Sequence, residues 1–371
     1  MLSLSCSSSH CVATATLLFL VVSVLHTTAA TRSLKEHTSP PKNASIPAIF
    51  LFGDSTVDSG NNNFFKTTFK SNFPPYGRRF PNHLATGRFT NGLLATDFVA
   101  RYLGIKDYVP PYLDSTLSLD ELKTGVCFAS AGSGIDPLTA TLDGVLPLQT
   151  QLDNFKEYKT RMESSIGKEG AKNLINKALF ICSAGTNDFV VNYYGLPVRR
   201  LTYTISAYQK FILHNVQLFI QGLVELGARK IVIVGLPPIG CVPAVITLNS
   251  DDALNHRGCI ESLCTVARDY NRMLQTTLAG MHMSHGALVA YIDIYKPLDD
   301  IVKNPRQFGF EKVNVGCCGS GLLEASFACN SESVLCLDDS KYVFWDAIHP
   351  TEAAYYYIFL SIRPVIDYFL K

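Results

Sequence analysis

Ile46-Pro47-Ala48-Ile49-Phe50-Leu51-Phe52-Gly53-Asp54-Ser55 is a short apolar run that ends in a glycine, an aspartate and a serine. A run of this length, rich in β-branched and aromatic residues, predicts a buried parallel strand followed by a tight turn. The turn places Ser55 at the carboxyl end of the strand, where open α/β sheets bind their ligands. Ser55 is therefore a candidate nucleophile if the chain also supplies a base and an oxyanion hole. For the tripeptide alone, an ordinary strand-to-loop turn is the alternative.

The bulk composition fits one globular domain with a full hydrophobic core. The chain has 371 residues, a formal net charge of +1 and 47% hydrophobic residues. A chain of this length buries a large core. Its nearly balanced charge gives no electrostatic attraction to nucleic acid or to an anionic membrane surface, so neither is expected as a partner. These properties leave the oligomeric state open.

The first 45 residues are expected to lie outside this domain. Residues 12–25 are apolar apart from two Thr and one Ser, and Thr27-Thr28-Ala29-Ala30 follows. This pattern predicts a signal peptide over 1–30, and its apolar run is too short for stable membrane insertion. Residues 31–45 predict a polar leader, in which Asn43 begins an N-glycosylation sequon. The chain is expected to be secreted, with the vacuole and the endoplasmic reticulum as alternative destinations.

The cysteines agree with a secretory route. Nine remain after the signal peptide, and six cluster late in the chain, at Cys259, Cys264, Cys317, Cys318, Cys329 and Cys336. In an oxidising compartment such a cluster predicts disulfides that tie loops together. A zinc site is the alternative, but the cluster has no Cys-x-x-Cys pair accompanied by a second pair of ligands. Cys127 and Cys182 lie in apolar, strand-like runs and are expected to be buried thiols.

Strand-like and helix-like segments alternate along the rest of the chain. After the first strand, further strands are expected over 125–130, 178–183, 229–234 and 287–293, and helices over 148–162, 205–226, 260–281 and 351–370. The strands are nearly continuous in apolar residues, which is typical of a parallel sheet covered on both faces. We therefore predict a three-layer α/β/α sandwich with a central parallel sheet of about five strands, in a single domain over 46–371.

Three of the expected strand ends carry small or polar residues that suit an oxyanion hole. They are Ser55, Gly132 and Asn187. The carboxyl ends of parallel strands meet at one rim of a sheet. A glycine there allows its backbone N–H to approach a substrate oxygen closely, and an asparagine amide adds a second fixed donor. A turn at Gly132 and a helix cap or loop contact at Asn187 are the structural alternatives.

The candidate base lies near the other end of the chain, in Phe344-Trp345-Asp346-Ala347-Ile348-His349-Pro350. At a spacing of three residues in a helical turn, Asp346 and His349 face the same side. The carboxylate then holds one imidazole nitrogen while the other faces the serine, which is the arrangement of a Ser-His-Asp triad. A histidine with a purely structural role is the alternative.

At this point the chain resembles a known family. Phe52-Gly53-Asp54-Ser55-Thr56-Val57-Asp58-Ser59-Gly60-Asn61-Asn62 is similar to the first signature block of the plant GDSL esterase/lipases of the SGNH hydrolase superfamily. Later segments match that family in order: 87–92, 128–134, 185–189, 237–241, 317–319 and 345–350. Two positions depart from its pattern, because Cys127 stands where the family usually has asparagine and Ala131 where a glycine is common.

The resemblance implies an SGNH hydrolase with a flavodoxin-like fold. It implies Ser55 as the nucleophile, His349 as the base, Asp346 as the residue that orients it, and Gly132 and Asn187 as partners of Ser55 in the oxyanion hole. The expected activity is hydrolysis of a lipid-like or other carboxylic ester through an acyl-enzyme, without a metal or an organic cofactor. An acyltransferase with the same acyl-enzyme and a catalytically silent binding or defence protein are the alternatives. We expect the loops 64–80 and 193–201 to wall the substrate pocket.

Overall fold

The computed structural model describes residues 46–281 and 286–370. The expected signal peptide over 1–30, the leader over 31–45 and the sequon at Asn43 lie outside these residues. The strands β1 (Ile49–Gly53), β2 (Leu179–Ser183), β3 (Lys230–Val234) and β4 (Leu288–Ile292) form a parallel sheet in that order. The main strands of the prediction are therefore present where the apolar runs placed them.

The expected strand over 125–130 is not a regular strand, so the sheet has four regular strands where about five were predicted. This segment instead runs parallel to β1 on its free side, where the N–H of Leu51 donates to Val126 (3.2 Å) and the N–H of Phe128 donates to Leu51 (2.7 Å). It bridges to Leu51 on one side and to Pro111 on the other. A proline has no N–H to donate, so a regular ladder cannot form on that side. If this segment is counted as the second strand along the chain, it lies at the edge of the sheet beside β1, and the strand order is that of a flavodoxin-like sheet.

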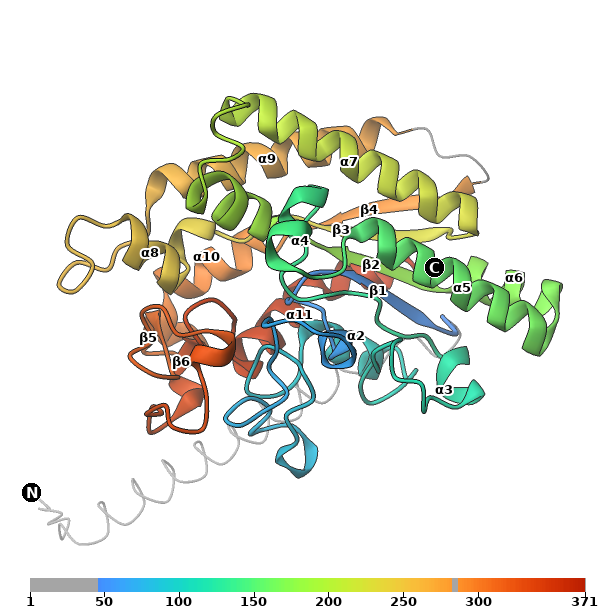
Figure 1. Ribbon diagram of the computed structural model, residues 1–371, viewed down its shortest axis with the longest axis horizontal. Helices are drawn as coiled ribbons and strands as arrows, with labels where there is room; N and C mark the ends of the chain where they lie inside the picture. Colours follow the sequence, from blue (N-terminus) through green and yellow to red (C-terminus); the bar gives the residue numbers. More distant parts are fainter. Residues whose placement is uncertain (1–45, 282–285, 371) are drawn as a thin grey trace, which may run out of the picture. The chain divides into compact units, whose positions relative to one another are not determined.

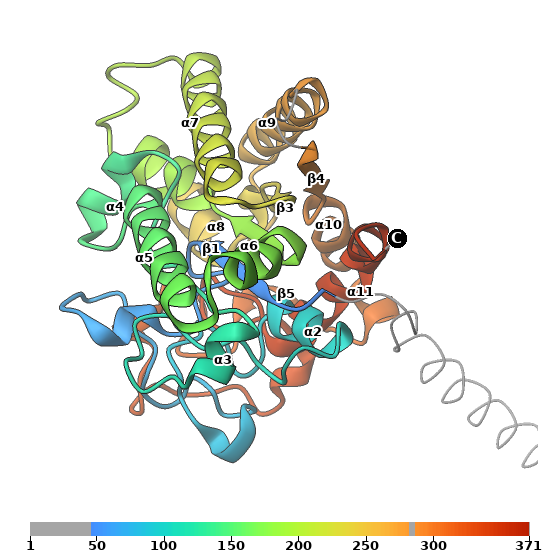
Figure 2. The same ribbon diagram turned by 90° about the vertical axis from the view of Figure 1, so that its right-hand side faces the viewer.

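Helices cover the sheet on both faces, which gives the predicted three layers (Figures 1 and 2). One face carries α5 (Leu148–Ile166), α7 (Ile205–Leu226) and α9 (Glu261–Gly280), and the other carries α2 (Ala95–Tyr102), α10 (Tyr295–Lys303) and α11 (Glu352–Tyr368). The remaining α-helices of the described chain are α3 (Leu119–Lys123), α4 (Pro137–Asp143), α6 (Lys168–Lys177) and α8 (Pro243–Asn249). None of the helices in the described part of the chain is both long and apolar enough to cross a bilayer.

The turn after β1 depends on a glycine. Gly53 has φ +131°, and a Cβ at this position would lie 1.8 Å from the carbonyl oxygen of Ser183 at the end of β2. A side chain is excluded both by this contact and by the backbone conformation. Gln151 on α5 holds the same turn, because its side chain accepts from the N–H of Gly53 (2.8 Å) and donates to its carbonyl (2.9 Å). The turn therefore delivers Ser55 at a fixed position on the rim of the sheet.

Residues 312–344 form a small lobe at the same rim, which disulfides tie together. Its two strands, β5 (Lys312–Gly316) and β6 (Tyr342–Phe344), lie below the main sheet in the view of Figure 1. The disulfides are Cys317–Cys336, Cys318–Cys329 and, outside the lobe, Cys241–Cys259. Disulfides were therefore predicted correctly, but Cys264 is a buried free thiol and Cys241 takes the place expected for it. Cys127 and Cys182 are buried thiols, as expected.

Candidate active site

Ser55, His349 and Asp346 form a continuous hydrogen-bonded chain at the rim of the sheet. His349 Nε2 lies 2.8 Å from Ser55 Oγ, and His349 Nδ1 lies 2.8 Å from Asp346 Oδ2. The exposed fractions of the three residues are 8%, 5% and 0%, respectively. Because an ionised carboxylate only accepts hydrogen bonds, Nδ1 carries the imidazole proton and Nε2 is left to accept the proton of Ser55.

The turn between Asp346 and His349 explains why a spacing of three residues brings these side chains together. Asp346 Oδ1 accepts from the backbone N–H of Ile348 (2.8 Å) and of His349 (2.7 Å). The carboxylate therefore closes the turn and holds the imidazole of His349 with the same pair of oxygens. Both features follow from local sequence, whereas the meeting with Ser55 joins residues 294 positions apart.

The structure brings one of the two expected oxyanion-hole partners, Asn187, to the cavity at Ser55, and a hydrogen bond joins it to the segment that carries Gly132. The side-chain amide of Asn187 donates to the carbonyl of Ser133 (2.9 Å), the residue after Gly132. Gly132 has φ +86°, and a Cβ on it would lie 3.1 Å from the ring of Phe69. The glycine therefore suits both the backbone conformation and the close packing at this turn. Ser55 and Asn187 line one common cavity.

Three buried carboxyls hold the segments that meet at this site. Asp54 Oδ1 accepts from the N–H of Thr56 (2.9 Å) in the turn that carries Ser55. Asp58 Oδ2 accepts from the N–H of Ala131 (2.9 Å), and Asp188 Oδ2 accepts from the N–H of Ile135 (2.8 Å). Burial raises the pKa of Asp54 and of Asp58 to about 6 and that of Asp188 to about 7, although their hydrogen bonds act in the opposite direction.

These raised pKa values predict that mild acid stabilises the fold. Each carboxyl binds its proton more tightly in the folded chain than in the unfolded chain, where its pKa is near the ordinary 3.8. The free energy of unfolding therefore rises as pH falls through the folded pKa values, by up to about 1.4 kcal/mol per pH unit for each carboxyl. We expect a higher Tm at about pH 5 than at about pH 7.5. Asp188→Asn should flatten this dependence, and a Tm that falls steadily over the same window would contradict it.

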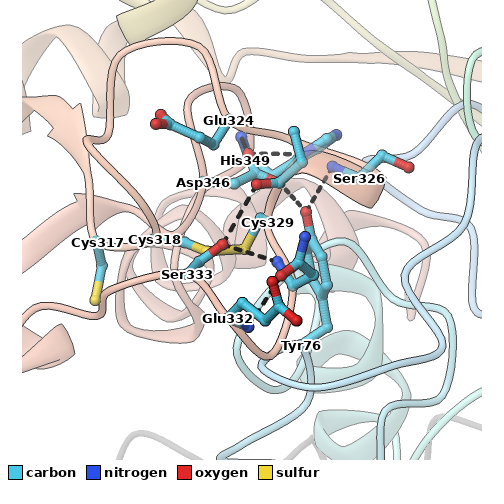
Figure 3. Close-up of a disulfide and its surroundings, with 12 residues drawn as sticks. Tyr76, Cys317, Cys318, Glu324, Ser326, Cys329, Glu332, Ser333, Asp346 and His349 are labelled. Carbon is cyan, nitrogen blue, oxygen red and sulfur yellow. Dashed lines mark hydrogen bonds and ion pairs between the residues drawn. A yellow bond between two sulfur atoms is a disulfide. The ribbon is translucent and has the colours of Figure 1, made fainter.

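Tyr76 is a part of the site that the sequence did not identify. Its phenol donates to Asp346 Oδ2 (2.7 Å) and accepts from the N–H of Ser326 (2.8 Å). Figure 3 shows this phenol between Ser326 and Asp346, with the Cys318–Cys329 disulfide beside them. Burial, and then the negative charge of Asp346, raises the pKa of Tyr76 well above its usual value, so the phenol stays protonated and remains a donor. Tyr76 thus links Ser326, in the segment between β5 and β6, to the carboxylate of Asp346.

Tyr76→Phe is expected to lower kcat about tenfold and to change KM little. Loss of a hydrogen bond to a charged group weakens the orientation of Asp346 but removes no contact with a substrate. Tyr158→Phe is the matched control, because Tyr158 is also fully buried and donates to the carbonyl of Leu122 (2.9 Å) away from the site. Steady-state kinetics and thermal unfolding of both variants separate the two effects. An equal loss of kcat in the two variants would show that Tyr76 acts only through stability.

A cavity lies between the sheet and the helix layer of α2, α10 and α11, and Ser55 and His349 are among the residues that line it. The cavity volume is about 90 Å³. Most of its lining is aliphatic, including Val234, Ile292, Leu298, Ile358 and Ile362. The prediction that the loops 64–80 and 193–201 wall the pocket is wrong for this cavity, since its lining comes from strand ends and helices. Side chains on the facing sheet and helices leave this space between the layers unfilled.

The described residues hold no group of three or more His, Cys, Asp or Glu side chains placed to bind a metal ion. Ser55, His349 and Asn187 contribute a hydroxyl, an imidazole and an amide to the lining of the cavity, and the carboxylate of Asp346 holds the imidazole. This donor set matches nucleophilic chemistry on a carbonyl group, with the hydroxyl as nucleophile, the imidazole as base and the amide as an anion-stabilising donor.

Comparison with known proteins gives a consistent result over nearly the whole described chain. The model of the GDSL-like lipase/acylhydrolase family matches residues 49–362. GDSL esterase/lipase At5g45960 of Arabidopsis thaliana is 54% identical over 342 residues, which cover 91% of each chain. GDSL esterase/lipase At1g06990 of the same plant is 44% identical over 327 residues, covering 88% of this chain and 91% of its own.

Proposed function

This chain belongs to the GDSL-like lipase/acylhydrolase family, and from that premise we propose that it is a secreted serine ester hydrolase that works through an acyl-enzyme. The observation that carries the proposal is the hydrogen-bonded chain from Ser55 through His349 to Asp346. The relatives named above are called esterase/lipases, and the aliphatic cavity beside Ser55 suits the acyl part of a lipid-like or other carboxylic ester.

The proposed reaction uses each member of the chain in turn. His349 Nε2 takes the proton of Ser55 as Oγ attacks the ester carbonyl, and Asp346 stabilises the imidazolium that forms. The imidazolium gives its proton to the leaving alcohol, and the C–O bond to that alcohol breaks. Water then repeats the sequence on the acyl-enzyme, which releases the acid and restores Ser55.

The negative charge that develops on the carbonyl oxygen needs fixed donors. We assign these to the backbone N–H groups of Ser55 and Gly132 and to the side-chain amide of Asn187. The bond from Asn187 to the carbonyl of Ser133 supports this assignment, because it joins the asparagine to the segment that carries Gly132. One well-placed donor of this kind typically lowers the barrier by about 2.7–4 kcal/mol.

Secretion is supported by the three disulfides, since such bonds persist mainly in oxidising compartments. The signal peptide over 1–30 and glycosylation at Asn43 remain part of the same proposal.

The proposed reaction requires no cofactor. An acyltransferase would share the first half of the reaction, and it differs only in passing the acyl group to an alcohol in place of water.

The direct test is covalent labelling of the secreted protein with a fluorophosphonate probe. We expect one adduct, on Ser55, together with hydrolysis of p-nitrophenyl butyrate that labelling abolishes. Labelling at another serine, or hydrolysis that survives complete labelling of Ser55, would overturn the proposal.

A second experiment separates a hydrolase from an acyltransferase. The reaction is run in water with added glycerol, and the amounts of free acid and of glycerol ester are measured.

A further inference from the structure

The imidazole of His349 has an aromatic neighbour, Phe89, that the proposed reaction does not use. The two ring centroids lie 4.9 Å apart, and the ring planes make an angle of 45°. Phe89 is buried and belongs to residues 87–92, which match the family pattern but do not line the cavity. Ser55 and Asp346 hold the imidazole by hydrogen bonds at its two nitrogens, which lie on its edge, whereas Phe89 packs against the ring. The hydrogen bonds therefore fix the edge of the imidazole, and the packing limits its tilt.

Phe89 is itself packed in a buried cluster at the disulfide-tied lobe. The ring of Tyr76 lies 5.9 Å from it, centroid to centroid, in an edge-to-face arrangement, and aromatic rings attract each other at this separation. The same cluster contains cysteines of both lobe disulfides, namely Cys317, Cys318 and Cys329. Because protein interiors are closely packed, the ring of Phe89 has little freedom to move away from the imidazole.

The two residues after Phe89 hold the backbone that follows the base. Thr90 Oγ1 donates to the carbonyl of Pro350 (2.9 Å), and Asn91 Oδ1 accepts from the N–H of Glu352 (2.7 Å). Both Thr90 and Asn91 are buried. Three consecutive side chains therefore contact the imidazole and the backbone beyond it, across a separation of about 260 positions in the sequence.

The residue before Phe89 anchors this segment to the helix α2. Arg88 Nε donates to Asp97 Oδ2 (2.8 Å), and Arg88 Nη2 donates to Asp97 Oδ1 (2.9 Å). Both side chains are buried, with exposed fractions of 3% and 1%. A two-pronged pair of this kind fixes orientation as well as distance. The segment that packs against the base is therefore held independently of the base.

We propose that Phe89 is a positioning residue whose ring keeps the imidazole of His349 aligned with Ser55, and that Thr90 supports it by holding the turn that carries the imidazole. The inference rests on the proposed function, since it concerns the same base. In that reaction His349 Nε2 takes a proton from one oxygen and gives it to another, so the imidazole must stay within reach of both. A displacement of about 1 Å in such a site can lower the rate about 100-fold.

The first test is Phe89→Leu, which leaves space beside the imidazole but keeps an apolar side chain. We expect kcat for p-nitrophenyl butyrate to fall about tenfold, because the base is less well aligned. Since Phe89 does not line the cavity, KM should change by less than about twofold. Fluorophosphonate labelling of Ser55 depends on the same base, so its rate should fall by a similar factor.

Phe155→Leu is the matched control for this variant. Phe155 on α5 is also fully buried among aromatic rings, and it does not line the cavity. It should lower the Tm by an amount comparable to Phe89→Leu, because both changes remove buried ring atoms, but it should keep kcat. An equal loss of kcat in the two variants, or an unchanged kcat in Phe89→Leu, would overturn the inference.

A second pair of variants tests the support from Thr90, even if Phe89→Leu does not fold. Thr90→Val keeps the shape of the side chain but removes the hydrogen bond to Pro350, so kcat should fall about threefold with KM unchanged. Thr90→Ser keeps the hydroxyl and should restore kcat. If Thr90→Ser loses as much activity as Thr90→Val, the hydrogen bond does not position the base and this part of the inference fails.

A spectroscopic measurement makes the inference independent of turnover. Long-range ¹H–¹⁵N NMR of protein labelled with ¹⁵N-histidine shows which imidazole nitrogen carries the proton, and the signals of His349 are identified by their loss in His349→Gln. We expect a single tautomer with the proton on Nδ1 in the unaltered protein and in Phe155→Leu. In Phe89→Leu we expect signals that are broadened or averaged between tautomers.

The two readouts together separate this inference from the proposed function. If esters are hydrolysed but Phe89→Leu leaves both kcat and the signals of His349 unchanged, the inference fails and the proposed function stands. If the unaltered protein hydrolyses no ester and Ser55 is not labelled, the proposed function fails. In that case altered signals of His349 in Phe89→Leu still support the role of Phe89 in holding the imidazole, and unchanged signals overturn it.

Discussion

Ser55→Ala is expected to lower kcat/KM for p-nitrophenyl butyrate by at least about 10⁴-fold, because it removes the oxygen that we propose forms the acyl-enzyme. The backbone donors and the cavity remain, so a small rate above that of water persists. The fold should be unaffected, since Ser55 Oγ contacts His349 at the rim of the sheet and supports no strand or helix. We expect the Tm to change by less than about 3 °C.

Ser71→Ala is the matched control for this variant. Ser71 is fully buried, its hydroxyl has no hydrogen-bond partner among the described residues, and it does not line the cavity. The control should keep its activity, and rates measured on both variants from the same purification guard against a contaminating esterase. If Ser55→Ala retains more than a few per cent of the activity while the fluorophosphonate probe still labels it, the nucleophile lies elsewhere.

Asp346→Asn is expected to lower kcat/KM by about 10³–10⁴-fold and also to destabilise the fold. The carboxylate accepts from Tyr76, from two backbone N–H groups and from the imidazole of His349. An amide has one accepting oxygen in place of two, and its NH₂ group would face donors. It therefore favours the wrong tautomer of the histidine and leaves buried donors unpaired. Rates of hydrolysis and of fluorophosphonate labelling should fall in parallel.

Two further variants test whether this loss is specific to Asp346. Asp367→Asn removes a carboxylate that accepts from a tyrosine, Tyr102, away from the site, and it should keep its activity. Asp54→Asn tests the buried carboxyl next to Ser55, which accepts hydrogen bonds from the N–H and the hydroxyl of Thr56. If Asp54→Asn abolished labelling of Ser55 and Asp346→Asn did not, Asp54 would be the carboxylate that orients the base.

The local parts of the site were accessible to sequence reasoning because each depends on neighbours along the chain. The apolar run before Gly53 predicted β1, and the polar residues after the strands predicted where a site lies. The spacing between Asp346 and His349 predicted their contact, which the turn shows. The segment over 125–130 was less predictable, because its irregular pairing depends on Pro111, a partner brought beside it by the fold.

The remaining parts depend on contacts between distant segments. Tyr76 and Asp346 are 270 positions apart, and a tyrosine in a proline-rich loop gave no sign of this bond. The pairing of Cys241 with Cys259, which leaves Cys264 free, likewise depends on how the segments approach each other. The sequence could not predict the position of the cavity either, because the cavity lies where the helices α2, α10 and α11 leave space between themselves and the sheet.

By itself, then, the sequence determined the layered α/β architecture and the residues whose chemistry suits an acyl transfer. Hydrophobic periodicity, a glycine turn and an i, i+3 spacing act within a few residues, so they can be read along the chain. Only the tertiary structure decided which tyrosine holds Asp346, which cysteines pair, and that an aliphatic cavity lies beside Ser55. These features are distances between side chains of separate segments, and such distances are set by packing.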